Sequence, residues 1–345
     1  MPQVTVYGAG IFGLSIAWCC LKKGAQVTVI DPHGPGAGAS GGIVGALAPH
    51  VPENWNDKKA FQFDSLIMAE AFWAEVEATS GISPGYARTG RLQPVVDEAA
   101  LDLARARSKT AEQLWQGKAV WQVIEAGEAD FAPATPTGLL IRDTLSARLH
   151  PRRACAALAG AIRARGGVIT QEGAPRGQVL HATGVAGLEE LSRAYGKTIG
   201  NGVKGQGALL HFAAPDMPQL FADTIHIVPH ADGTTAIGST SERDYDDPTG
   251  TDAQLDDVIE RAMRAVPVLH GARVIERWAG LRPRSRSRAP MLGAHPLHPG
   301  QFIANGGFKI GFGMAPKVGQ VMADLLLDGV DEIPDGFRPD VSLPG

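Results

Sequence analysis

The 345-residue chain can bury a large core and is long for one compact unit, so we expect two domains. A net charge of −4 without a basic run argues against nucleic acid or an anionic membrane surface as a partner. No apolar stretch reaches the roughly 18 residues of a membrane span, and the first strand starts too early to leave room for a signal peptide. A cytoplasmic protein is therefore expected.

The first thirty residues predict a βαβ unit. Gln3–Tyr7 is typical of a short buried strand, and an apolar helix is expected from Leu14 to about Lys23. Gly24 ends that helix, and Ala25–Ile30 predicts a second strand. A glycine-rich turn between strand and helix is the usual place for a dinucleotide pyrophosphate.

Four residues of this unit have separate roles in dinucleotide binding. Gly8 permits the tight turn, Gly10 lets the backbone approach a pyrophosphate, and Gly13 allows close packing of helix on strand. Asp31, after the second strand, is placed to accept a hydrogen bond from a ribose hydroxyl, which argues against NADP. A purely structural glycine turn is the alternative.

Three cysteines fall inside apolar helical patterns rather than at paired loop positions: Cys19, Cys20 and Cys155. This placement predicts buried, reduced side chains and argues against disulfides. No cluster shows metal-ligand spacing along the chain, so no metal is expected.

The segment 34–50 favours FAD over NAD. An NAD-binding domain would continue its sheet here, whereas this segment is a loop rich in glycine and small residues. Such residues suit a loop lying against phosphates and a flat ring system. Residues 43–48 are too apolar for the alternative, a flexible linker. No histidine or cysteine stands where covalent attachment is suggested, so non-covalent FAD is expected.

At this point the sequence resembles the D-amino-acid oxidase and glycine oxidase family of FAD-dependent amine oxidoreductases. The similar segments follow the family's order along the chain: Leu149–Arg153, Val179–Gly184, Val203–Gln206, Ile227–Pro229, Asp232–Thr234, Ala236–Thr240, Trp278–Pro283, Gly306–Gly311 and Ala315–Pro316. Together they cover nearly the whole chain. The segment 166–179 is short, and no residue for the adenine can be assigned in it.

The resemblance implies an α/β fold in which a Rossmann-like FAD-binding domain is interleaved with an α+β substrate domain on an antiparallel sheet. The FAD-binding domain would comprise residues 1–50, 140–202 and 280–345, and the substrate domain 51–139 and 203–279. Periodicity predicts helices over Ala60–Gly81, Ala99–Gly117, Asp252–Val266 and Lys317–Leu327, and strands over 205–213 and 224–240 with a turn at His230–Gly233.

The fingerprint, the loop and the family pattern together assign twenty residues to the cofactor. These are Gly8, Gly10, Ile11, Phe12, Gly13, Asp31, Pro32, Ala39, Ser40, Val44, Gly45, Ala46, Thr183, Gly184, Gly307, Phe308, Ile310, Gly311, Phe312 and Gly313.

Amine oxidation by a flavin moves a hydride from the carbon that bears nitrogen to the flavin N5, so the protein must mainly hold the substrate. The family pattern assigns Arg282 to the substrate carboxylate, which its planar guanidinium matches in bidentate fashion. A structural ion pair or a phosphate contact is the alternative. Arg284, Arg286 and Arg288 are expected to form a solvated or interface strand face.

Three further residues are candidates for the substrate pocket. Lys309 stands where glycine oxidase has an arginine, and it keeps the charge but loses the fork; a flavin contact or a surface position are the alternatives. His226 replaces a tyrosine of that pattern and would titrate near neutrality. His50 could lie beside the ring system, or could cap or pack. Both replacements put glycine itself in doubt and allow a larger or differently charged amine.

These features predict an oxidase acting on a small-molecule amine or amino acid, giving an imine and hydrogen peroxide. A dehydrogenase of the same fold passing electrons to a quinone or carrier is the main alternative. A tRNA-modifying enzyme and a flavin-binding subunit of a larger complex are further alternatives, the former disfavoured by the absence of a basic patch. The sequence is compatible with a homo-oligomer.

Overall fold

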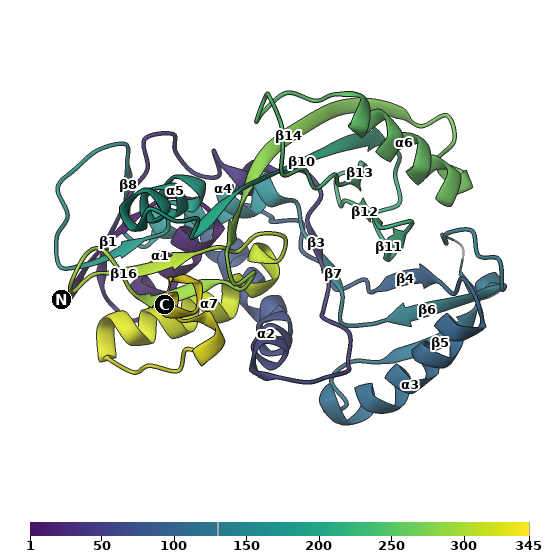
Figure 1. The fold of residues 1–345 in the computed structure, drawn as a ribbon, viewed down its shortest axis with the longest axis horizontal. Coiled ribbons are helices and arrows are strands. Elements are labelled where there is room, and N and C mark those ends of the chain that lie inside the picture. The colour runs from purple at the N-terminus through teal and green to yellow at the C-terminus, as the bar shows by residue number, and fades with distance from the viewer. Residues whose placement is uncertain (130, 345) are drawn as a thin grey trace.

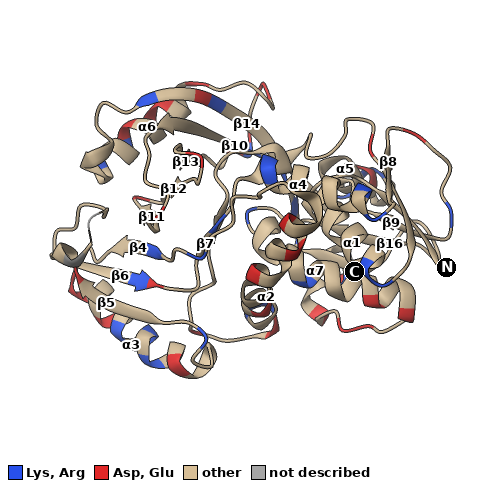
Figure 2. Cartoon of the chain, turned by 180° about the vertical axis from the view of Figure 1, so that it is seen from behind, with Lys and Arg blue, Asp and Glu red and all other residues tan. Residues whose placement is uncertain are grey.

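Two sheets of different size organise the chain, and each forms the centre of one lobe (Figure 1). The structure is a computed structural model that describes residues 1–129 and 131–344. Basic and acidic residues are mixed along the ribbon of both lobes (Figure 2). None of the helices in these two ranges is long and apolar enough to cross a membrane.

We name each lobe by the size of its sheet, and the smaller lobe is the one with the six-stranded sheet, in the order β15-β16-β9-β1-β2-β8. Every neighbouring pair is parallel except β15 with β16. The strands are β1 Gln3–Tyr7, β2 Gln26–Ile30, β8 Val168–Thr170, β9 Gln178–His181, β15 Met291–Ala294 and β16 Phe302–Asn305. A mostly parallel sheet that starts with a βαβ unit confirms the expected nucleotide-binding fold.

Helices cover both faces of this sheet. On one face α1 (Ile11–Lys22) packs against α7 (Gly311–Asp328) and α4 (Pro151–Ala164), and α2 (Asp57–Ser80) packs against the last two. The opposite face carries α5 (Gly184–Tyr195), which packs with Met291 and Ile303 in a separate apolar cluster. Burial on both faces leaves Thr5 of β1 as buried as its neighbours Val4 and Val6.

The larger lobe contains an eight-stranded sheet in the order β14-β10-β13-β12-β11-β4-β6-β5. Its pairs are antiparallel except β4 with β11. The strands are β4 Arg91–Pro94, β5 Trp121–Glu125, β6 Leu139–Asp143, β10 Gly200–His211, β11 Gln219–Ala222, β12 Ile225–Pro229, β13 Thr235–Gly238 and β14 Arg273–Ser285. Helix α3 (Glu98–Leu114) packs on β5, and α6 (Ala253–Ala265) packs on β10, β12 and β13.

A third, two-stranded sheet joins the lobes. It pairs β3 (Ala46–Leu47) with β7 (Ala147–Arg148), one strand from each of two connections. The buried side chain of Gln219 donates a hydrogen bond to the carbonyl of Ala147 at 2.8 Å, which ties this sheet to the larger one. The loop after β2 is therefore anchored at its far end.

The structure moves several predicted boundaries. Helix α7 starts at Gly311 rather than Lys317, because Pro316 is accommodated inside the helix. Strands β6 and β14 belong to the larger sheet through Asp143 and Ser285, so the chain crosses between lobes a few residues later than predicted. Helix α2 was assigned from the sequence to the substrate domain, but it packs on α4 and α7 of the smaller lobe. The three cysteines are free and buried, as expected.

Candidate cofactor and substrate site

The turn after β1 admits only glycine at two positions. Gly8 has φ +100°, and a Cβ there would lie closer than 3.0 Å to the carbonyl oxygen of Ala182. A Cβ on Gly13 would lie closer than 3.0 Å to the carbonyl oxygen of Gly8. The two glycines let α1 start directly over the end of β1, beside the end of β9.

Two side chains fix this turn from outside. The Asp31 carboxylate accepts hydrogen bonds from the backbone N–H of Ala9 at 2.7 Å and of His33 at 2.9 Å. The Ser40 hydroxyl accepts a hydrogen bond from the Ile11 N–H at 2.9 Å. The next N–H groups of α1 have no partner within the helix and lie at its positive end. These residues fit the pyrophosphate and ribose of a dinucleotide, and their contact with the cofactor stays a prediction.

The loop over residues 39–46 is held against the larger lobe. The ring of buried His230 donates a hydrogen bond through Nε2 to the carbonyl of Ile43 at 2.8 Å, and burial lowers its pKa to about 4. Gly42 lies under Trp278, since a Cβ there would be 3.3 Å from the indole ring. The neutral imidazole of His230 therefore positions the segment that was assigned to the flavin. From the sequence, His230 was predicted only to lie in a turn.

The segment 306–313 packs against the start of α1. A Cβ on Gly307 would lie 2.9 Å from the ring of Phe12 in α1. Asn305 donates a hydrogen bond from Nδ2 to the Gly184 carbonyl at 2.8 Å and accepts one from the Gly306 N–H at 2.7 Å. The glycine turn after β1, the loop over residues 39–46 and the segment 306–313 were all assigned to FAD. They thus lie together in the structure, although they are far apart in the sequence.

Three cations surround the ring of Phe308. Arg282 Cζ, Arg284 Cζ and Lys309 Nζ each lie 5.7 Å from its centroid. We call these four residues the Phe308 cluster. Phe308 itself has φ +42°, a conformation that is costly for a residue with a Cβ and is typical of functional sites.

The structure places one arginine of the expected solvated or interface face in the Phe308 cluster. Arg284 is half-buried there, because side chains two residues apart on β14 share a face, as Arg282 and Arg284 do. Arg286 and Arg288 are exposed, in line with a solvated face.

Arg282 is bound to the larger sheet and keeps one donor free. Its Nη atoms donate to the Ser239 hydroxyl at 2.8 Å, to the Thr240 carbonyl at 2.5 Å and to the Lys204 carbonyl at 3.3 Å. Its buried Nε–H has no partner in the described part of the chain. Burial lowers the pKa of Arg282 to about 10, and Glu242 opposes this shift. The guanidinium remains charged at neutral pH without forming an ion pair within residues 1–129 and 131–344.

His226 is close enough to Lys309 for the lysine charge to affect its pKa. Burial and then the charges of Arg91 and Lys309 lower the pKa of His226 to about 3. The expectation that His226 titrates near neutrality is therefore wrong, because its imidazole is desolvated and faces cations. Partial burial, with the charges of Arg282 and Arg284, lowers the pKa of Lys309.

His50 is separate from the Phe308 cluster. Its Nδ1 lies 2.5 Å from Gln62 Oε1 of α2, and the same oxygen accepts from the His50 N–H at 2.7 Å. No hydrogen bond or ion pair of the described residues joins His50 to Arg282. Its role beside the ring system stays a prediction.

Comparison with known proteins relates this geometry to a family. Residues 3–325 match the family described as DAO, FAD-dependent oxidoreductase. Glycine oxidase from Pseudomonas putida (strain KT2440) is 28% identical over 359 residues, covering 94% of each chain. The bifunctional protein ThiO/ThiG from Trichormus variabilis is 27% identical over 349 residues, covering 94% of this chain and 53% of its own length.

Solved structures share the fold. Iminodiacetate oxidase (IdaA) from Chelativorans sp. BNC1 superposes with a TM-score of 0.84 at 23% identity, covering 97% of this chain and 98% of its own. Glycine oxidase from Geobacillus kaustophilus superposes with a TM-score of 0.81 at 21% identity, covering 98% of both chains.

Proposed function

Since the chain belongs to the DAO family of FAD-dependent oxidoreductases, we propose that it oxidises the carbon–nitrogen bond of an amino acid or related amine, with molecular oxygen as the electron acceptor. FAD would be held non-covalently by the glycine turn after β1, by Asp31 and by the loop over residues 39–46.

The free Nε–H of Arg282 is the observation that carries this proposal. A buried guanidinium donor without a partner costs free energy, and such exceptions in a folded protein call for an explanation. A substrate carboxylate supplies both the missing acceptor and the missing countercharge. We therefore assign Arg282 as the anchor of the carboxylate.

The charges around Phe308 also narrow the substrate class. Arg284 and Lys309 add two positive charges next to the one on Arg282. Carboxylates are attracted to such a cluster, and cationic side chains are repelled from it. We propose an amine that carries a second acidic group, in preference to glycine.

The protein residues act by binding and orientation. Arg282 binds the carboxylate, and the exposed Lys309 adds a positive charge next to it. Neutral His226 offers the substrate a hydrogen bond without adding a fourth cation. Bound FAD supplies the acceptor for the hydride that leaves the substrate carbon. Loss of that hydride and of a proton from nitrogen gives an imine, which water hydrolyses to a 2-oxo acid.

Reaction in air tests the acceptor. If oxygen takes the two electrons, hydrogen peroxide forms in a one-to-one ratio to the 2-oxo acid, and both can be measured in the same sample. Rapid reduction of an artificial dye without peroxide would contradict the oxidase proposal and support the dehydrogenase, while amine oxidation itself would stand.

A further inference from the structure

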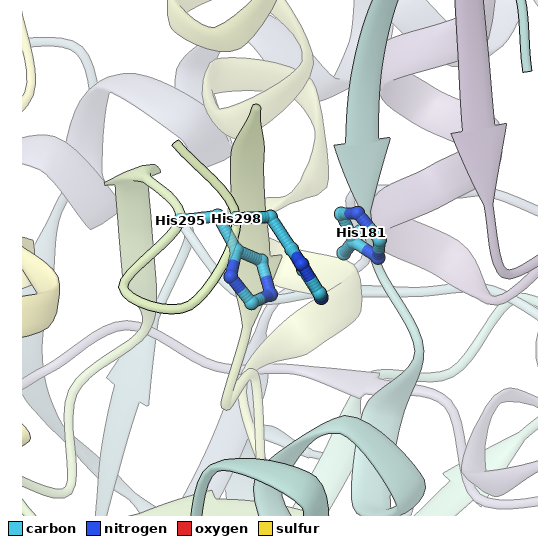
Figure 3. A group of neighbouring side chains, drawn as sticks. All are labelled: His181, His295 and His298. Atoms are coloured by element: carbon cyan, nitrogen blue, oxygen red, sulfur yellow. The ribbon is translucent and has the colours of Figure 1, made fainter. Parts of the chain in front are cut away.

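Three histidines lie close together at one end of the six-stranded sheet (Figure 3). His181 ends β9, while His295 and His298 lie in the hairpin loop between β15 and β16. One ligand atom from each ring lies within 4.8 Å of the other two. The ring centroids are 4.4–4.9 Å apart. We call these residues the histidine triad.

The triad is separate from the redox site. Leu180 packs in the core with α1 and α7, so strand alternation turns the next residue, His181, to the opposite face. Ile303, which pairs with His181, packs with α5 on that face. The triad therefore lies on the α5 side of the sheet, and the Phe308 cluster makes no use of it.

The hairpin loop holds its two histidines in place. The His295 N–H donates to the Gln301 carbonyl at 2.8 Å, and the Gln301 N–H donates to the His298 carbonyl at 3.0 Å. Pro296 and Pro299 each follow a triad histidine and fix φ in the loop. The loop backbone is therefore already ordered before a ligand binds.

Two partners orient the imidazoles from outside. His181 Nε2 lies 2.6 Å from Gln301 Oε1, which fixes Nε2 as the donor and leaves Nδ1 free. His298 Nε2 lies 3.5 Å from Glu190 Oε1 of α5. Metal-ligating histidines usually have their second nitrogen held in this way by an amide, carbonyl or carboxylate oxygen.

We propose that the triad binds one divalent transition metal ion of the Zn²⁺ type, with water completing the coordination and Glu190 holding the second nitrogen of His298. Imidazole nitrogens are ligands that Zn²⁺, Co²⁺ and Ni²⁺ prefer. Metal–nitrogen bonds of about 2.0–2.1 Å place tetrahedral ligands about 3.4 Å apart, so ligand atoms within 4.8 Å of one another must approach by up to about 1.4 Å. At His295, coordination through Nδ1 would replace the hydrogen bond from the Leu297 N–H at 3.1 Å.

The ion would act as a clamp. The triad joins β9 to the hairpin loop across β16, and Glu190 adds α5, so one ion ties together three segments of the smaller lobe. An ion that binds only the folded state raises the unfolding temperature in proportion to the logarithm of its concentration. We expect the bound ion to raise the stability of the folded protein and to leave substrate turnover unchanged.

Calorimetric titration of Zn²⁺ into the untagged, FAD-loaded protein tests the proposal, since a polyhistidine tag would itself bind the ion. We expect one ion per chain and a higher unfolding temperature in its presence. His298→Ala should weaken binding at least 100-fold, and Glu190→Gln should weaken it about 10-fold. His211→Ala, which removes an exposed histidine from β10, is the matched control and should bind like the unmodified protein.

Flavin absorbance and circular dichroism check that each variant is folded. Stoichiometric binding that His298→Ala abolishes and His211→Ala retains supports the site. Absence of binding, or equal binding by all variants, overturns it. If His298→Ala fails to fold, the Glu190→Gln titration decides, because that residue lies on the surface of α5.

Discussion

Replacing Gly13 with alanine is expected to give a protein that does not retain FAD. The new Cβ would lie within 3.0 Å of the Gly8 carbonyl oxygen, which is backbone and cannot move aside without opening the turn. Opening the turn separates the start of α1 from the ends of β1 and β9, where the pyrophosphate would bind. The ratio of flavin to protein absorbance after gel filtration measures the loss.

Gly127→Ala is the matched control for this experiment. Gly127 lies in the larger lobe, has no left-handed φ, and a Cβ there meets nothing within 4 Å. This variant should keep its full complement of flavin. A yellow, fully loaded Gly13→Ala protein would show that the turn does not bind the cofactor in the proposed way.

Replacing Arg282 is expected to have the second largest effect. Arg282→Lys keeps a positive charge but loses the free Nε–H, and it should lower kcat/KM for amino-acid substrates by roughly 30- to 100-fold, or about 2–3 kcal/mol. Most of the loss should lie in KM, because the carboxylate is bound in both ground and transition states. Amines without a carboxylate should be affected little.

Arg286→Ala controls for a general loss of positive charge, since Arg286 belongs to the same arginine-rich stretch and is exposed. It should leave KM nearly unchanged. Equal losses for amino acids and simple amines in Arg282→Lys would remove Arg282 from the anchor role. They would indicate that its bonds to Ser239 and Thr240 matter only for folding.

The local part of the fold could be predicted because local chemistry determines it. The glycine turn, the ends of β1 and β2, and α1 follow from apolar periodicity and from positions that only glycine can occupy. The start of α7 could not be predicted, because Pro316 usually ends or precedes a helix and only the packing of α7 on α1 and α2 shows that it is tolerated.

Residues that depend on tertiary packing were harder to predict. The place of Arg284 in the Phe308 cluster could not be predicted, because alternation along a strand shows which residues share a face but not which face is covered. His226 was expected to titrate near neutrality because nothing in the sequence reveals its burial beside Arg91. His181 joins His295 and His298 only through the strand order β15-β16-β9, and the one local signal was the short spacing between the last two.

Anaerobic mixing of the FAD-loaded protein with a panel of amines tests the central proposal most directly. The panel should include glycine, neutral amino acids, amino dicarboxylates and amines without a carboxylate. We predict that the visible absorption of oxidised flavin is bleached by carboxylate-bearing amines, fastest by those with a second acidic group. If no member of the panel bleaches a flavin that dithionite reduces readily, amine oxidation is not the function of this site.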